Sequence, residues 1–270
     1  MKPLEAGVLF WVGRHSFEDV LDFDVRVAQL GIGPSVALSR AYALAWSARL
    51  RDSGVTVRTV FAAYEGEDYA DIPTVQRTVG FVPPETRDAR EARTYEVIDF
   101  AGSIGAPSFA CHIGAIAPHD HDAVLHLVRR IADRCAAAGL SFALETGQET
   151  APELLRFMDE VARPNLGINF DPANMILYGT GDPIEAFELL APQVVSVHAK
   201  DGVYPPKSQP EALGAETPLG QGAVDFPRFV SALKGADYSG QLFVEREGVG
   251  RDQWVADVGT ALNTLARLAL

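Results

Sequence analysis

NLGINFDPANMILYGTGDPIEAFELLAPQVVSVHAKDG, residues 165–202, decides the fold of this 270-residue chain. The apolar runs at 166–170 and 194–197 have the composition of buried strands, and a helix over 183–190 follows the glycine-rich turn between them. Asp171 comes directly after the first run, and His198 comes directly after the second. A strand, a helix and a second strand in this order predict one βα unit of a parallel sheet.

The same arrangement occurs on both sides of this stretch. Upstream, SFALE places Glu145 at the end of an apolar run, and downstream QLFVE places Glu245 in the same way. The steps from Glu145 to Asp171, to His198 and to Glu245 are 26, 27 and 47 residues long. A barrel unit of strand, helix and loops takes roughly 25–35 residues, so the last step contains an extra loop, at 202–222.

Eight strand signals alternate with eight helix signals along the chain. The predicted strands are 7–12, 35–38, 55–61, 107–111, 140–144, 166–170, 194–197 and 241–244. The predicted helices are 17–30, 41–51, 85–104, 119–138, 152–161, 183–190, 227–233 and 253–268, and 62–84 is irregular. The strands are continuous apolar runs, as in parallel strands that are covered on both faces.

An open doubly wound sheet is the alternative fold. It would need a glycine-rich phosphate turn after the first strand, and WVGRHS at 11–16 is not such a turn. We therefore predict an α/β fold, a single (β/α)8 TIM barrel, in one domain over residues 1–270.

The composition indicates which kinds of binding partner and which cellular location to expect. The net charge of −13 disfavours binding to nucleic acid or to an anionic membrane. No apolar stretch approaches the roughly 20 residues of a membrane span. The two cysteines, Cys111 and Cys135, form no disulfide framework, which favours a cytoplasmic protein. A homo-oligomer is compatible with the sequence.

The four polar residues at the strand ends form the predicted site. In a barrel, the C-terminal ends of the strands meet at one mouth, so Glu145, Asp171, His198 and Glu245 would surround a common point. Three carboxylates and one imidazole suit one divalent ion with open positions, Mn²⁺ first, with Mg²⁺, Co²⁺ or Zn²⁺ as alternatives. The histidines of HDHD, 119–122, are interpreted instead as part of a polar helix N-terminus.

The segments ALETGQE, NFDPANMILYG, VHAKDG, PLGQGAVDF and VERE carry a family resemblance. They resemble the xylose-isomerase-like barrel superfamily of sugar isomerases and epimerases, which includes the D-tagatose 3-epimerase, hydroxypyruvate isomerase and inosose dehydratase groups. The resemblance covers essentially the whole chain and is strongest over 108–247. It implies that the four residues hold the metal and that Glu145 and Glu245 flank the substrate.

The resemblance also implies substrate-binding residues. His112 resembles a substrate-facing histidine, Lys200 belongs to a His-x-Lys-Asp run, and Arg246 is a candidate clamp for a substrate oxygen. Asn174 stands where D-tagatose 3-epimerase relatives have a histidine that helps to hold the substrate. Asn174 can hydrogen-bond a substrate but cannot titrate near neutral pH, so we expect it to orient a substrate other than the free ketohexoses of those epimerases.

The expected function is a metal-dependent sugar or sugar phosphate isomerase or epimerase of carbohydrate metabolism, which moves a proton through a metal-stabilised enediolate. The same chemistry can expel a hydroxyl group, so a keto-sugar or inosose dehydratase is the alternative. A non-catalytic carbohydrate-binding barrel is a third class. The more distant relative endonuclease IV needs additional metal ligands and a basic surface for DNA, which this chain lacks.

Overall fold

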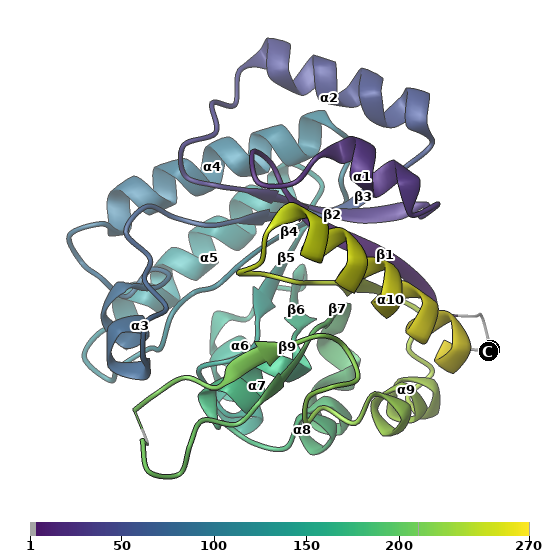
Figure 1. The fold of residues 1–270 in the computed structure, drawn as a ribbon. Helices are drawn as coiled ribbons and strands as arrows, with labels where there is room; N and C mark the ends of the chain where they lie inside the picture. Colours follow the sequence, from purple (N-terminus) through teal and green to yellow (C-terminus); the bar gives the residue numbers. More distant parts are fainter. Residues whose placement is uncertain (1–3, 210, 270) are drawn as a thin grey trace.

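The computed structural model describes residues 4–209 and 211–269. In this part of the chain, eight parallel strands close into a barrel in the order β1-β10-β7-β6-β5-β4-β3-β2 (Figure 1). The strands are β1 (Glu5–Trp11), β2 (Val27–Ile32), β3 (Thr56–Ala62), β4 (Ser108–Cys111), β5 (Ser141–Glu145), β6 (Leu166–Phe170), β7 (Val194–Ala199) and β10 (Gln241–Val244). The predicted TIM barrel is therefore confirmed.

The helices lie around the strands. They are α1 (Phe17–Asp22), α2 (Arg40–Ser53), α3 (Ile72–Thr78), α4 (Arg87–Ser103), α5 (His121–Ala137), α6 (Ala151–Val161), α7 (Pro172–Tyr178), α8 (Pro183–Leu190), α9 (Phe226–Gly235) and α10 (Arg251–Ala269). None of the helices in the described part of the chain combines the length and the apolar character that crossing a membrane requires.

Each barrel strand has an outer and an inner face. The outer faces join the helices in one large apolar core, whereas Leu9, Val27, Ala110, Ala143 and Phe243 belong to a separate, smaller apolar cluster with Trp11 and Phe61. Side chains alternate between the two faces of a strand, so a residue two positions after an inner residue also faces inward. This rule directs the side chains at the C-terminal strand ends into the mouth.

The predicted helix over 17–30 is wrong in its second half. Helix α1 ends at Asp22, Asp24 has a φ of 53°, and residues 27–32 form β2, in which all six residues are buried. Val27 and Leu30 fit helical spacing as well as they fit a strand, and the left-handed backbone at Asp24 ends the helix before it reaches them. The predicted strand at 35–38 is a partly exposed loop.

The two long connections contain structure that the sequence did not predict. The segment 62–84 includes α3, and the segment after β7 forms an antiparallel hairpin of β8 (Asp201–Val203) and β9 (Ala215–Thr217), which packs beside α7 (Figure 1). The backbone N–H of Ile72 donates to the carbonyl of Glu211 at 2.9 Å. The two connections are thus joined to each other beside the mouth of the barrel.

Candidate metal centre

The four predicted ligands come together at the mouth. Glu145 is the last residue of β5, Asp171 and Glu245 directly follow β6 and β10, and His198 lies inside β7, one residue before its end. All four side chains are buried, and one ligand atom from each lies within 4.8 Å of the others. Four strands that are neighbours in the barrel therefore bring the predicted set to one point.

His198 Nδ1 is at the centre of this group. It lies 2.7 Å from Glu245 Oε2, 2.9 Å from Glu145 Oε1 and 3.7 Å from Asp171 Oδ2. His198 Nδ1, Asp171 Oδ2 and Glu245 Oε2 are buried and have no hydrogen-bond partner among the described residues. Buried polar atoms without partners are costly, and one cation would satisfy all three atoms. The residues therefore fit a divalent metal ion.

Local structure turns one oxygen of Asp171 toward this point. Asp171 is the N-cap of α7, and its Oδ1 accepts hydrogen bonds from the backbone N–H groups of Ala173 and Asn174 at 2.8 and 3.0 Å. Pro172, at the first helical position, needs no such partner. Because Oδ1 is committed to the helix end, Oδ2 is the oxygen that faces His198.

The electrostatics of the group also favour a cation. Burial raises the pKa of Glu145 to about 7, because His198 offsets only part of this effect. Burial alone would raise the pKa of Glu245, but Lys200 and His198 hold this pKa well below its usual range. Burial alone would lower the pKa of His198, but the carboxylates of Glu145 and Glu245 raise it well above its usual value. A cation at this point would interact favourably with all three carboxylates.

His112 and Asn174 both line a cavity of about 560 Å³ that also includes Glu145 and Glu245. The His112 ring packs against Phe61, with the ring centroids 5.8 Å apart. Burial, followed by the ammonium of Lys200, lowers the pKa of His112 to about 3. The Asn174 amide donates to the Thr146 carbonyl at 3.2 Å and to Glu145 Oε1 at 3.4 Å. Both side chains lie where a substrate beside the metal could reach them.

Lys200 lines the same cavity and is surrounded by acids. Its Nζ lies 3.4 Å from Glu245 Oε1, 3.5 Å from Glu247 Oε2 and 3.7 Å from Asp171 Oδ2. Its ammonium therefore neutralises part of the charge of the ligand set, in addition to any contact with substrate.

Arg246 occupies a different place. Its Nε lies 2.8 Å from Asp257 Oδ2 on α10, and its Nη1 lies 3.0 Å from Glu216 Oε1 on β9. Arg246 is not among the residues that line the cavity. Since Glu245 faces inward, its neighbour along the chain faces the other way. We therefore do not retain Arg246 as an oxygen clamp; it ties the hairpin to the last helix.

Several cavity residues were missed from the sequence. Trp11, Tyr69, Tyr178 and Glu247 line the cavity with the predicted residues. Trp11 is 6% exposed, and its indole N–H has no hydrogen-bond partner within the described residues. Its position two residues after the inward-facing Leu9 was an available signal.

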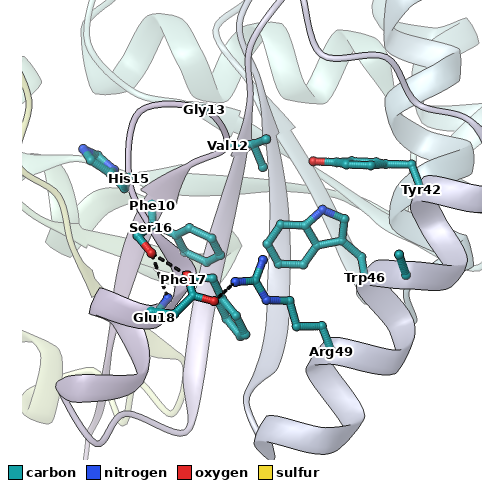
Figure 2. A pocket seen from close by; sticks show the side chains of 11 residues that line it. Phe10, Val12, Gly13, His15, Ser16, Phe17, Glu18, Tyr42, Trp46 and Arg49 are labelled. Carbon is teal, nitrogen blue, oxygen red and sulfur yellow. Dashed lines mark hydrogen bonds and ion pairs between the residues drawn. The ribbon is translucent and has the colours of Figure 1, made fainter.

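A second cavity, of about 290 Å³, lies between the end of β1, α1 and α2 (Figure 2). Its walls are largely aromatic, and the Arg49 guanidinium lies 4.8 Å from the centroid of the Phe17 ring and 5.3 Å from that of Trp46. Arg49 also pairs with Glu18, as Figure 2 shows. None of the four predicted metal ligands lines this cavity. We therefore place the chemistry in the cavity of about 560 Å³ at the mouth, which the ligands Glu145 and Glu245 line.

Comparison with known proteins agrees with this fold. A family model described as xylose isomerase-like TIM barrel matches residues 17–268. The chain belongs to this family. A solved structure of a xylose isomerase domain protein from Planctomyces limnophilus is 38% identical, with a TM-score of 0.95, over 98% of this chain and 97% of that one. Membership of the xylose isomerase-like family, expected from the sequence motifs, is confirmed.

Two further relatives are more distant. A ketose 3-epimerase from Arthrobacter globiformis is 30% identical over 125 residues, which are 44% of this chain and 39% of that protein. The match thus spans about two fifths of the length of this curated relative. A xylose isomerase-like TIM barrel protein from Mycobacterium smegmatis, in complex with magnesium, is 16% identical with a TM-score of 0.72, over 99% of this chain and 96% of that one. This last likeness shows the fold alone.

Proposed function

We propose that this protein is a divalent-metal-dependent isomerase or epimerase of an unphosphorylated keto-sugar. The observation that carries the proposal is the buried group of Glu145, Asp171, His198 and Glu245, whose ligand atoms share one point beside a cavity of about 560 Å³. The ligands are mostly hard carboxylate oxygens, which favour Mn²⁺ or Mg²⁺. Such an ion, when bound, would act as a Lewis acid that stabilises negative charge on a substrate oxygen.

The chain supplies the groups that move the proton. Glu145 and Glu245 both line the cavity, and they come from β5 and from the end of β10, which are separated in the barrel by β6 and β7. One carboxylate removes the proton from the carbon next to the carbonyl, and the other returns a proton.

Other side chains hold the sugar. The amide of Asn174 and the ammonium of Lys200 provide polar contacts, and the uncharged ring of His112 provides a donor or an acceptor, all in the wall of the cavity. The aromatic side chains of Trp11 and Tyr69 cover the apolar face of the ring or chain and exclude water from the reacting carbon.

The charge of the cavity favours a neutral substrate over a sugar phosphate. Besides the metal ligands, its wall carries Glu65, Glu67, Glu216 and Glu247, against the cations Arg14 and Lys200. Lys200 already lies within 4 Å of three carboxylates. A phosphate dianion would be repelled by such a wall, whereas the hydroxyl groups of a free sugar can donate hydrogen bonds to it.

The test is proton exchange in D₂O over a panel of ketoses, their phosphates and keto-inositols. We expect deuterium to appear at the carbon next to the carbonyl of a free keto-sugar, together with about one divalent ion per chain by metal analysis. Glu145→Gln and Glu245→Gln should each lose activity by about 10²–10⁴-fold or more. Glu188→Gln on the exposed face of α8 makes the same chemical change and serves as the control.

The outcomes separate the candidate functions. Full activity in either ligand variant would exclude the proposed proton transfer. Product NMR that shows loss of water in place of isomerisation would assign a dehydratase, and preference for the phosphorylated sugars would contradict the charge argument.

A further inference from the structure

A chain of polar side chains lies directly below the metal ligands, inside the barrel. Gln29 on β2 and Asn169 on β6 are completely buried, and Ser196 on β7 is 3% exposed. Each lies two positions before a residue at the mouth: Gln29 before Gly31, Asn169 before Asp171 and Ser196 before His198. The interior of such barrels is usually filled with apolar side chains, and buried polar groups are costly unless they are paired.

The hydrogen bonds of this layer connect two of the metal ligands. His198 Nε2 lies 2.7 Å from Gln29 Oε1, and the Gln29 amide Nε2 donates to Asn169 Oδ1 at 2.9 Å. The Asn169 amide Nδ2 in turn donates to Glu145 Oε2, and the Ser196 hydroxyl donates to Asn169 Oδ1. The connection thus runs from the Glu145 carboxylate through two amides to the imidazole of His198.

Chemistry fixes the direction of every bond in this chain. An ionised carboxylate only accepts, so Asn169 must present its NH₂ to Glu145 and its oxygen to Gln29. Gln29 must then present its NH₂ to Asn169 and its oxygen to His198. A carbonyl oxygen cannot donate, so the proton of the His198–Gln29 bond belongs to Nε2. Asn169 Nδ2 has a second N–H and lies 3.0 Å from Nε2, but Gln29 Oε1 lies closer, at 2.7 Å, and can only accept.

We propose that Gln29 and Asn169 are positioning residues that set the tautomer of His198. With the proton held on Nε2, the lone pair of Nδ1 points at Glu145, Asp171 and Glu245, where the metal would bind. The outer partner of a ligating histidine commonly fixes its ring and its tautomer in this way. The inference rests on the proposed metal-dependent function, and it adds to that function a layer of residues that lies below the metal ligands.

The first test observes the tautomer directly in the wild-type protein. Wild-type protein with ¹⁵N-labelled histidine is saturated with Mg²⁺, and the His198 signals are assigned by their loss in His198→Gln. We expect a proton on Nε2 and none on Nδ1, and the exchange of this proton with water should be slow because Nε2 is buried and paired. A proton on Nδ1 in the Mg²⁺-loaded protein would overturn the proposal.

The second test measures the affinity for Mn²⁺ by competition with a fluorescent chelator. Gln29→Leu removes the acceptor for Nε2 at nearly constant volume and should weaken Mn²⁺ binding by about 10–100-fold. Gln29→Glu keeps an acceptor and should bind Mn²⁺ more tightly than Gln29→Leu does. Thr59→Val is the matched control, because Thr59 pairs with Gln29 in the sheet register and is 2% exposed.

The order of the variants distinguishes positioning from packing. If Gln29 only filled space, the apolar Leu would be tolerated better than a buried Glu, so tighter Mn²⁺ binding by Gln29→Leu than by Gln29→Glu would overturn the proposal. Equal affinity for Mn²⁺ in wild type and in Gln29→Leu would also overturn the proposal. A wild-type protein that binds neither Mn²⁺ nor Mg²⁺ would refute the proposed function itself, which these other outcomes leave intact.

Discussion

Asp201 is a single polar side chain whose removal should cause a large loss of stability. Its carboxylate is 1% exposed and accepts four backbone N–H groups, from Gly202, Gly220, Gly222 and Val224, at distances of 2.9, 2.9, 3.0 and 3.1 Å. The side chain thus joins the start of the β8–β9 hairpin to the residues just before α9. Asp201→Ala would remove all four bonds at once.

The magnitude follows from these four bonds. Hydrogen bonds to a charged group contribute about 1.5–3 kcal/mol each, so four give an upper bound of about 6–12 kcal/mol. Water can reach part of the vacated loop, and we expect a loss of about 4 kcal/mol in the free energy of unfolding. The entropy of unfolding of a 270-residue protein is roughly 0.6 kcal/mol per kelvin, so the Tm should fall by about 7 °C.

Differential scanning calorimetry at fixed metal concentration measures this change. Asp182→Ala is the control, since Asp182 caps α8 through two backbone N–H groups and is exposed. It should cost about 1 kcal/mol, or about 2 °C. Asp201→Asn, which keeps one oxygen, should fall between the two. A Tm for Asp201→Ala within 2 °C of wild type, or equal to that of Asp182→Ala, would show that the four bonds do not act as we describe.

Two further predictions concern the cavity. Asn174→Ala should raise KM for the true substrate, as expected for lost ground-state binding, while the metal content measured by elemental analysis stays near that of wild type. Unchanged kinetics would show that Asn174 has only a structural role in its loop. Gly31→Ala should lower stability by about 1–3 kcal/mol and reduce kcat/KM, because a Cβ at Gly31 would lie 2.3 Å from the Trp11 indole. Gly33→Ala, whose Cβ meets nothing within 4 Å, is the control in chemical denaturation, and equal effects of the two changes would contradict the steric reason.

The convergence of the four candidate metal ligands could be predicted because each stands where a clear strand signal ends. The runs are mostly apolar, with single polar residues such as Asn169 and Ser196, and the predicted strands end within two residues of the observed ones. Convergence then follows from the topology of the barrel. The proposed role of the group as a metal site rests on the type and order of these residues.

The second strand could not be predicted in the same way. VAQLGI contains a polar Gln29, and its apolar residues also fit a helix, so local pattern favoured a continuation of α1. The closure of the barrel makes this segment a strand, because it buries Gln29 against Asn169, which lies 140 residues later in the sequence. Arg246 is a different case, because strand alternation from Glu245 already indicates that it faces away from the cavity.

The bond between Ile72 and Glu211 has a consequence for protein engineering and for the evolution of this barrel. It joins two surface segments that are far apart in the sequence, and both contribute walls to the same cavity. The lengths of the two segments are therefore not independent, because an insertion in one segment would displace the hydrogen bond that holds the other. Variation in substrate preference among related chains should show paired changes at 62–84 and 201–224, and a chimera built by grafting one segment should recover activity only when its counterpart is grafted with it.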